Sequence, residues 1–106
     1  MRLFVYGTLM DPRCVRRLTG CQFRARPATL HGWARTVGRH GYPVIDPARG
    51  ARVEGLLLDD VDDGALRALD AYEDEGRLYR RQAVYVSVDG CPIACQAYVP
   101  PASQVA

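Results

Sequence analysis

Four carboxylates occur within six residues of each other in the second half of this chain, and such a group could carry acid–base chemistry. They are Asp70, Glu73, Asp74 and Glu75. All four lie at the predicted C-terminal end of a helix, which carries partial negative charge, so that each acid there typically costs a few tenths to about 1 kcal/mol. Local rules are often broken where a residue is functional or compensated. Arginines follow at positions 77, 80 and 81, so a solvated acidic turn paired with arginines is the alternative interpretation.

A second candidate feature is the loop Tyr6-Gly7-Thr8-Leu9, which follows a short strand predicted over residues 2–6. Glycine lets the backbone turn sharply here and expose consecutive N–H groups ahead of a helix, and such a concavity can bind an anion. Asp11 and Pro12 supply the N-cap and the first-turn proline of that helix, which is predicted to run through Leu18. Many ordinary strand-to-helix turns contain Gly-Thr, so this signal indicates little by itself.

The remaining elements must position these two features. The second helix is predicted from 60–63 to about Tyr72, with one apolar stripe at Leu66, Leu69 and Tyr72. Six short strands are predicted over residues 2–6, 28–30, 33–37, 52–59, 79–88 and 93–99, with breaks at Pro27 and Gly32 and a turn over 46–50. No regular βαβ alternation is visible. The sequence therefore predicts one α+β domain over residues 1–106, a small closed or strongly curved sheet of about six strands with two helices.

Composition excludes several classes of function. All fourteen basic residues are arginines, so a Schiff-base lysine and a P-loop lysine are both absent, and aldolase-like, pyridoxal-dependent and Walker-type NTPase functions are excluded. The net charge of +2 is too small to indicate a polyanionic partner, and the arginines alternate with acids, so no nucleic acid is expected. No apolar stretch approaches the roughly 18 residues of a membrane span, and the N-terminal residues do not resemble a signal peptide, so a cytoplasmic protein without a membrane partner is expected.

The cysteines are expected to be reduced, partly buried thiols. They are Cys14, Cys21, Cys91 and Cys95, and no pair has a CxxC spacing. A zinc site would need two separated pairs brought together, with His31 and His40 as the available imidazoles. We therefore predict no metal site and no cofactor.

Taken in order, four segments of the chain resemble one known family. They are Val5-Tyr6-Gly7-Thr8-Leu9, Gly41-Tyr42-Pro43, Leu69-Asp70-Ala71-Tyr72-Glu73 and Leu78-Tyr79-Arg80-Arg81. In content and order they resemble the γ-glutamylcyclotransferase-like (AIG2-like) proteins, and the resemblance covers nearly the whole chain. It implies a small β-barrel with flanking helices and a cavity in which the 6–9 loop faces the family's catalytic glutamate.

The resemblance assigns that catalytic position to Glu73 and puts further residues around the cavity. Tyr6, Gly7, Thr8 and Leu9 are implied to bind substrate, and Tyr42, Pro43, Tyr79 and Arg81 to border or support the cavity. Many members have glycine directly after the glutamate, whereas this chain has Asp74 and Glu75 before Gly76, which makes Glu75 a second candidate. Glu73 is preferred because it follows Leu69 by four residues and Leu66 by seven, on the same helix face. For Arg81, an ion pair with the acidic turn is the alternative to orienting a substrate carboxylate.

The implied reaction converts a γ-glutamyl amine, amino acid or related conjugate to 5-oxoproline and a released amine, with Glu73 as general acid/base and a small γ-glutamyl molecule as the partner. Fold membership does not guarantee turnover. A non-catalytic protein that binds an amino-acid-like ligand is one alternative. Another enzyme on the same scaffold, which cleaves γ-glutamyl-amine or isopeptide conjugates or removes a γ-glutamyl protecting group, is the other. The leaving group and the oligomeric state are not predicted.

Overall fold

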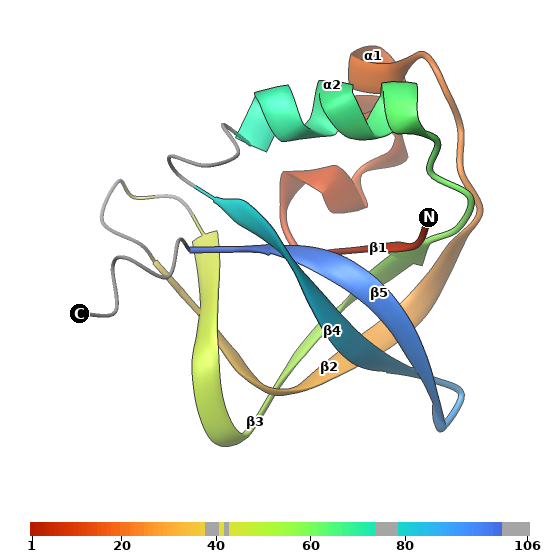
Figure 1. Ribbon diagram of the computed structural model, residues 1–106. Helices are drawn as coiled ribbons and strands as arrows, with labels where there is room; N and C mark the ends of the chain where they lie inside the picture. The colour runs from red at the N-terminus through yellow and green to blue at the C-terminus, as the bar shows by residue number, and fades with distance from the viewer. Residues whose placement is uncertain (38–40, 42, 74–78, 101–106) are drawn as a thin grey trace.

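A closed, mixed β-barrel with two α-helices on one side forms the described part of the chain (Figure 1). The computed structural model describes residues 1–37, 41, 43–73 and 79–100. Its elements are β1 (Leu3–Val5), the 3₁₀ helix η1 (Thr8–Met10), α1 (Pro12–Thr19), β2 (Ala25–Val37), β3 (Pro43–Leu58), α2 (Asp63–Glu73), β4 (Arg80–Val88) and β5 (Cys91–Val99). The strand order is β1-β3-β2-β4-β5, and the barrel is mixed because β1 pairs with β5 in parallel while the other neighbours are antiparallel. The predicted α+β barrel with two helices is confirmed.

Strand β1 is buried on both faces, and this explains its uninterrupted apolar sequence. Leu3 and Val5 belong to the core under the helices, whereas Phe4 between them belongs to the core inside the barrel. Residue Gly55 of β3 lets β1 pack this closely. A Cβ atom at position 55 would lie 2.7 Å from Cζ of Phe4 and would also collide with the carbonyl oxygen of Val5, so a larger residue is excluded.

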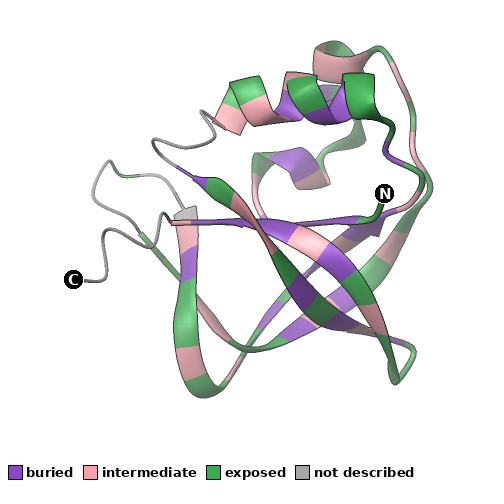
Figure 2. Ribbon diagram, in the orientation of Figure 1, coloured by how far each residue is buried: buried purple, intermediate pink, exposed green. Residues whose placement is uncertain are grey.

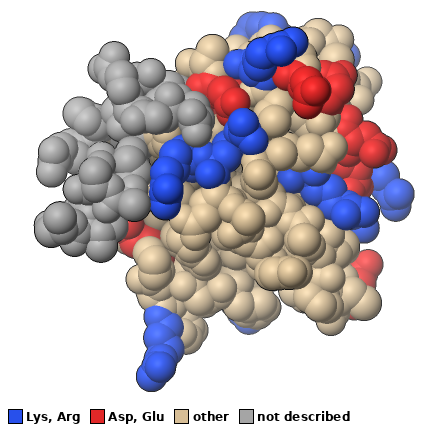
Figure 3. Space-filling model, viewed as in Figure 1, with Lys and Arg blue, Asp and Glu red and all other residues tan. Residues whose placement is uncertain are grey.

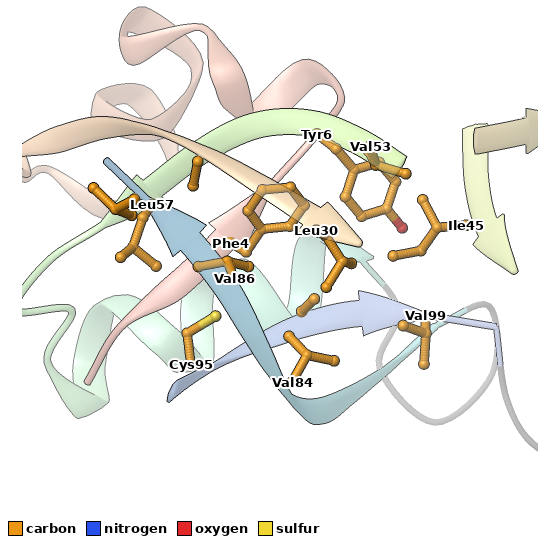
Figure 4. Close-up of a cluster of buried hydrophobic side chains, with 13 residues drawn as sticks. Phe4, Tyr6, Leu30, Ile45, Val53, Leu57, Val84, Val86, Cys95 and Val99 are labelled. Atoms are coloured by element: carbon orange, nitrogen blue, oxygen red, sulfur yellow. The ribbon is translucent and has the colours of Figure 1, made fainter. Parts of the chain in front are cut away.

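The barrel interior is filled by aliphatic side chains around two aromatic rings (Figure 4). Phe4 and Tyr6 lie two positions apart, and both side chains point to this inner side, with ring centroids 6.2 Å apart. On β4 the predicted alternation is observed, since Val84, Val86 and Val88 all point into this core. The inner core therefore fixes the position of β1, and with it the loop that β1 leads into.

A second core lies between the barrel and the helices. Helix α1 begins at the predicted cap, where the Asp11 side chain accepts a hydrogen bond of 2.9 Å from the backbone N–H of Arg13. Helix α2 buries Ala65, Leu66 and Leu69 against the barrel, and Figure 2 shows this buried face turned toward the strands. Neither helix in the described part of the chain is long and apolar enough to cross a membrane.

The described strands number five where about six were expected, because the predicted interruption at Gly32 does not end a strand. Strand β2 continues through Gly32, where the pairing register with β3 shifts between His31 and Trp33. Gly32 and Gly50 have positive φ values of 85° and 82° and absorb this irregularity as a bulge. The predicted turn over 46–50 is therefore wrong, since these residues belong to β3.

The expected break at Pro27 is also wrong. Pro27 pairs with Leu56 of β3, and on the other side of β2 the pairing recorded between described residues is Thr29 with Ser87 of β4. A residue without an N–H group is tolerated in a strand wherever one side needs no ladder hydrogen bond. The strand therefore begins before Pro27, at Ala25, and the two predicted pieces merge across Gly32.

Candidate active site

Four separate segments of the chain enclose a cavity of about 340 Å³ beside the C-terminal end of α2. Residues 4–9 of β1 and its following loop form one wall. The last helical turn contributes Tyr72 and Glu73, Tyr79 precedes β4, and Tyr98 lies near the end of β5. In Figure 1 this end of α2 lies close to the beginning of β4. The barrel closure brings together residues that are more than 90 positions apart.

Most of the residues expected at the site line this one cavity. The loop residues Tyr6, Gly7, Thr8 and Leu9 face it, as do Glu73 and Tyr79. Tyr42 and Glu75 lie outside the described residues. Pro43 begins β3, and its side chain is likewise outside the described part.

Among the described residues that line the cavity, Glu73 is the acidic one. Its side chain is half-buried, and burial raises the pKa of its carboxyl from the ordinary 4.5 to about 7, because the charged form loses solvation. A carboxyl group with this pKa exchanges protons readily at neutral pH, as a general base and acid must. The arrangement is thus suited to proton transfer inside an apolar, aromatic cavity.

Two tyrosines of the cavity wall, Tyr6 and Tyr98, are linked by hydrogen bonds to each other and to α2. The Tyr6 hydroxyl donates to the backbone carbonyl of Tyr98, and the Tyr98 hydroxyl donates to Oδ1 of Asp70 at 2.6 Å. Burial raises the pKa of Tyr6 well above its usual range, with further contributions from Tyr79 and Glu73. Burial likewise raises the pKa of Tyr98, helped by Asp70. Both hydroxyls therefore remain protonated hydrogen-bond donors at neutral pH.

Arg81 takes the alternative role considered from sequence. Its Nε atom donates to Oδ1 of Asp70 at 2.8 Å, and its guanidinium also donates to Oε1 of Gln96 at 2.5 Å. Arg81 is not among the described residues that line the cavity. The two described members of the acidic group at the end of α2 therefore differ, since Asp70 is ion-paired and Glu73 faces the cavity. Figure 3 shows acidic and arginine side chains next to one another on this face of the molecule.

Comparison with known proteins decides the family. A family model described as gamma-glutamyl cyclotransferase, AIG2-like, matches residues 3–106. The chain belongs to this family. The chain is similar to a Bos taurus gamma-glutamylaminecyclotransferase, with 35% identity over an alignment of 107 positions that covers 91% of this chain. It is also similar to AIG2-like protein D of Arabidopsis thaliana, with 36% identity over 85 positions that cover 79% of this chain. The crystal structure of an AIG2-like protein from Mus musculus superimposes with a TM-score of 0.73 at 29% identity, over 92% of this chain and 75% of the other.

The matched region of this γ-glutamylcyclotransferase-like chain covers part of the length of the relatives. It spans 63% of the bovine protein and 55% of the plant protein. The fold and the cavity described above are nevertheless contained within the matched residues 3–106. Among the described residues, no group of three or more His, Cys, Asp or Glu side chains is arranged to hold a metal ion.

Sequence reasoning missed two tyrosines in the cavity wall. Tyr72 was assigned to the apolar stripe of α2, but it is 45% exposed, and its hydroxyl lies 3.0 Å from Oγ1 of Thr8 across the cavity. Its position next to Glu73 was the available signal. Tyr98 was placed in a strand without any role, and its contact with Asp70 joins residues 28 positions apart. No local pattern could have revealed that contact.

Proposed function

We propose that this protein is a γ-glutamylcyclotransferase that converts a γ-glutamyl amine or a related γ-glutamyl conjugate to 5-oxoproline and a free amine. The observation that carries the proposal is Glu73, a half-buried carboxyl that has a pKa of about 7 and lines a cavity open to solvent. The name of the bovine relative supports the γ-glutamyl amine class of substrate.

In this reaction the α-amino nitrogen of the γ-glutamyl group attacks its own γ-carbonyl carbon. The new C–N bond closes a five-membered ring, and the old amide C–N bond breaks. The α-amine has a pKa of about 8 and is mostly protonated near pH 7, so it must lose a proton before it can attack. Over the whole reaction two protons leave this nitrogen and two reach the departing one, so neither water nor a redox partner is consumed.

Glu73 is proposed to move these protons. As the carboxylate it accepts a proton from the attacking nitrogen, and as the acid it delivers one to the leaving nitrogen. A solvated glutamate with a pKa near 4.5 would be a poor base here, whereas a value of about 7 matches the task. General acid–base catalysis typically contributes about 10²- to 10⁴-fold in rate.

The loop residues Gly7, Thr8 and Leu9 are proposed to hold the substrate. They line the cavity opposite the glutamate, at the start of η1 where helical N–H groups have no intrahelical acceptor. These N–H groups supply donors for the anionic oxygens of the substrate. Tyr6, Tyr79 and Tyr98 complete an aromatic wall that excludes water and favours the folded substrate conformation needed for ring closure.

The test is mass-spectrometric detection of 5-oxoproline from a panel of γ-glutamyl amines, γ-glutamyl amino acids and glutathione. Native protein is compared with Glu73→Gln, and Glu75→Gln serves as the matched control two residues away. We expect product from native protein and from Glu75→Gln, and none above background from Glu73→Gln. Calorimetric titration of the Glu73→Gln variant with the best substrate should show retained binding.

Two outcomes would contradict the proposal. Saturable binding without product from native protein would identify a ligand-binding protein on this fold. Loss of product in Glu75→Gln with activity retained in Glu73→Gln would transfer the acid/base role to Glu75.

A further inference from the structure

One oxygen atom ties α2 to two strands of the barrel. Oδ1 of Asp70 accepts hydrogen bonds from the Tyr98 hydroxyl at 2.6 Å and from Nε of Arg81 at 2.8 Å. Arg81 and Tyr98 face each other across the β4–β5 ladder, as register partners. Arg81 also bonds Gln96 on β5. We call Asp70, Arg81, Gln96 and Tyr98 the Asp70 network.

Within the network, Asp70 lies about one helical turn before Glu73 on α2. Asp70 and Glu73 are three positions apart, which corresponds to about 4.5 Å along a helix and places them on neighbouring positions of one face. The apolar anchors of α2, Ala65, Leu66 and Leu69, all lie before Asp70. Beyond Asp70, the Tyr72 hydroxyl contacts Thr8 of the loop at an exposed position. Helix ends fray unless they are held, and Asp70 is the last described residue of α2 before Glu73 that is hydrogen-bonded to a barrel strand.

The Asp70 network also contacts the cavity wall formed by residues 4–9. Tyr98 lines the cavity with its ring and uses its backbone carbonyl to accept the hydroxyl of Tyr6. Tyr6 in turn leads into the Gly7–Leu9 loop. Asp70 itself is not among the described residues that line the cavity, so it acts on the site through its neighbours.

We propose that Asp70 is a positioning residue that sets the distance between Glu73 and the substrate loop, by fixing the last turn of α2 to Arg81 and Tyr98. This inference rests on the proposed function for its kinetic consequence. Displacement of a catalytic group by about 1 Å can lower a rate on the order of 10²-fold. Loss of the anchor should therefore lower kcat, whereas KM, which depends on the loop and the aromatic wall, should change little.

The chain offers a matched control at another ion pair. Asp59 accepts two hydrogen bonds from Arg26, at 2.9 and 2.8 Å, and lies outside the cavity lining. The two arginine side chains are equally exposed, at 26% each. Asp59 also lies 3.5 Å from Nε of Arg2, so Asp59→Ala removes at least as many ionic contacts as Asp70→Ala. A merely structural role for Asp70 therefore predicts that Asp70→Ala has no larger effect on activity than Asp59→Ala.

The first experiment compares steady-state kinetics of native protein, Asp70→Ala, Asp70→Asn and Asp59→Ala on the best substrate, with urea unfolding of each. We expect Asp70→Ala to lower kcat roughly 10- to 100-fold with KM changed less than about threefold, and Asp59→Ala to leave kcat near native. Asp70→Asn keeps an Oδ1 acceptor for both donors and should recover part of kcat. Equal kcat in the two alanine variants would overturn the inference.

A second readout needs no turnover, so it separates failure of this inference from failure of the proposed function. The chain has only three glutamates, Glu54, Glu73 and Glu75, and side-chain ¹³C labelling of glutamate gives each a resonance whose pKa can be measured by NMR. Tyr98→Phe weakens the network without changing a charge near neutral pH. It leaves in place the other titratable residues that line the described part of the cavity with Glu73, namely Tyr6, Tyr72 and Tyr79, and it keeps the charges of Asp70 and Arg81.

If the network holds Glu73 in the cavity, Tyr98→Phe should lower the pKa of Glu73 from about 7 toward 4.5 as the carboxyl becomes better solvated. Because this variant deletes one hydroxyl from an intact ring, it also serves for kinetics if Asp70→Ala fails to fold. An unchanged Glu73 pKa together with native kcat in Tyr98→Phe would refute a positioning role.

Discussion

Replacement of Glu73 by glutamine should stabilise the protein, and more so as the pH rises. In the folded state the pKa of Glu73 is about 7, whereas the unfolded chain has the ordinary value of 4.5. The folded protein therefore binds more protons than the unfolded chain between these two values, and the free energy of unfolding falls as pH rises through this window. Above pH 7 the loss is complete, and it corresponds to roughly 3 kcal/mol.

Glutamine cannot ionise, so Glu73→Gln lacks this loss. Integrated over the titration, the stability advantage of Glu73→Gln over native protein should grow by about 2.5 kcal/mol between pH 5 and pH 8. Any effect of the amide on packing is independent of pH and cancels in this comparison. The measurement is urea unfolding of both proteins at pH 5, 6, 7 and 8, with Glu54→Gln as a control for loss of a glutamate at an exposed strand position.

A difference between native and Glu73→Gln that stays constant over this range would refute the reasoning. It would mean that Glu73 is solvated in the folded protein, and the cavity would then hold no acid with a pKa suited to proton transfer at neutral pH. A larger native stability at pH 8 would be equally contradictory, since it would require a stabilised carboxylate.

Three further predictions follow from the same geometry. The profile of kcat/KM against pH should rise between pH 6 and pH 8 with an apparent pKa near 7 as Glu73 becomes the carboxylate, and a flat profile over this range would contradict Glu73 as the base. Gly55→Ala should lower the free energy of unfolding by at least about 2 kcal/mol, because its Cβ would lie 2.7 Å from Phe4 Cζ, whereas Gly64→Ala on α2, 3.6 Å from its neighbour, should be neutral or stabilising in the same denaturation assay. Iodoacetamide at pH 8 should alkylate exposed Cys91 well before Cys95, whose thiol pKa is raised to about 11 by burial; equal rates by peptide mapping would show that Cys95 is accessible.

The parts of the fold that were predictable from sequence depend on short-range patterns. The Asp11 cap, the apolar positions of α2 before Tyr72 and the alternation of valines on β4 are all set within a few residues of chain. The long β2–β3 pairing was missed because Gly32 and Gly50 are ordinary turn residues when considered singly. Their positive φ values are absorbed in a bulge once a partner strand continues on both sides, and that partner is visible only in three dimensions.

The candidate site divides in the same way. The loop at Gly7 and the helix phase of Glu73 are local features, and both could be placed from sequence. The contacts of Tyr98 with Asp70 and Tyr6 depend on closure of the barrel, which brings β5 beside β1. For Arg81, sequence left two roles open; the ion pair with an acid of α2 is observed, and the substrate role stays a prediction.

The acids at the end of α2 show how one broken local rule can have two different physical resolutions. Asp70 lies where the helix dipole disfavours negative charge, and Arg81 and Tyr98 compensate it with two hydrogen bonds to one oxygen. Glu73, one turn later, is instead desolvated, and its pKa rises to about 7. Neighbouring carboxyl groups in such different environments can divide an anchoring role and a proton-transfer role between them. Loss of the arginine that compensates Asp70 should therefore disturb the anchor. Arg81→Ala should lower kcat through Asp70, even though Arg81 lies outside the described cavity lining.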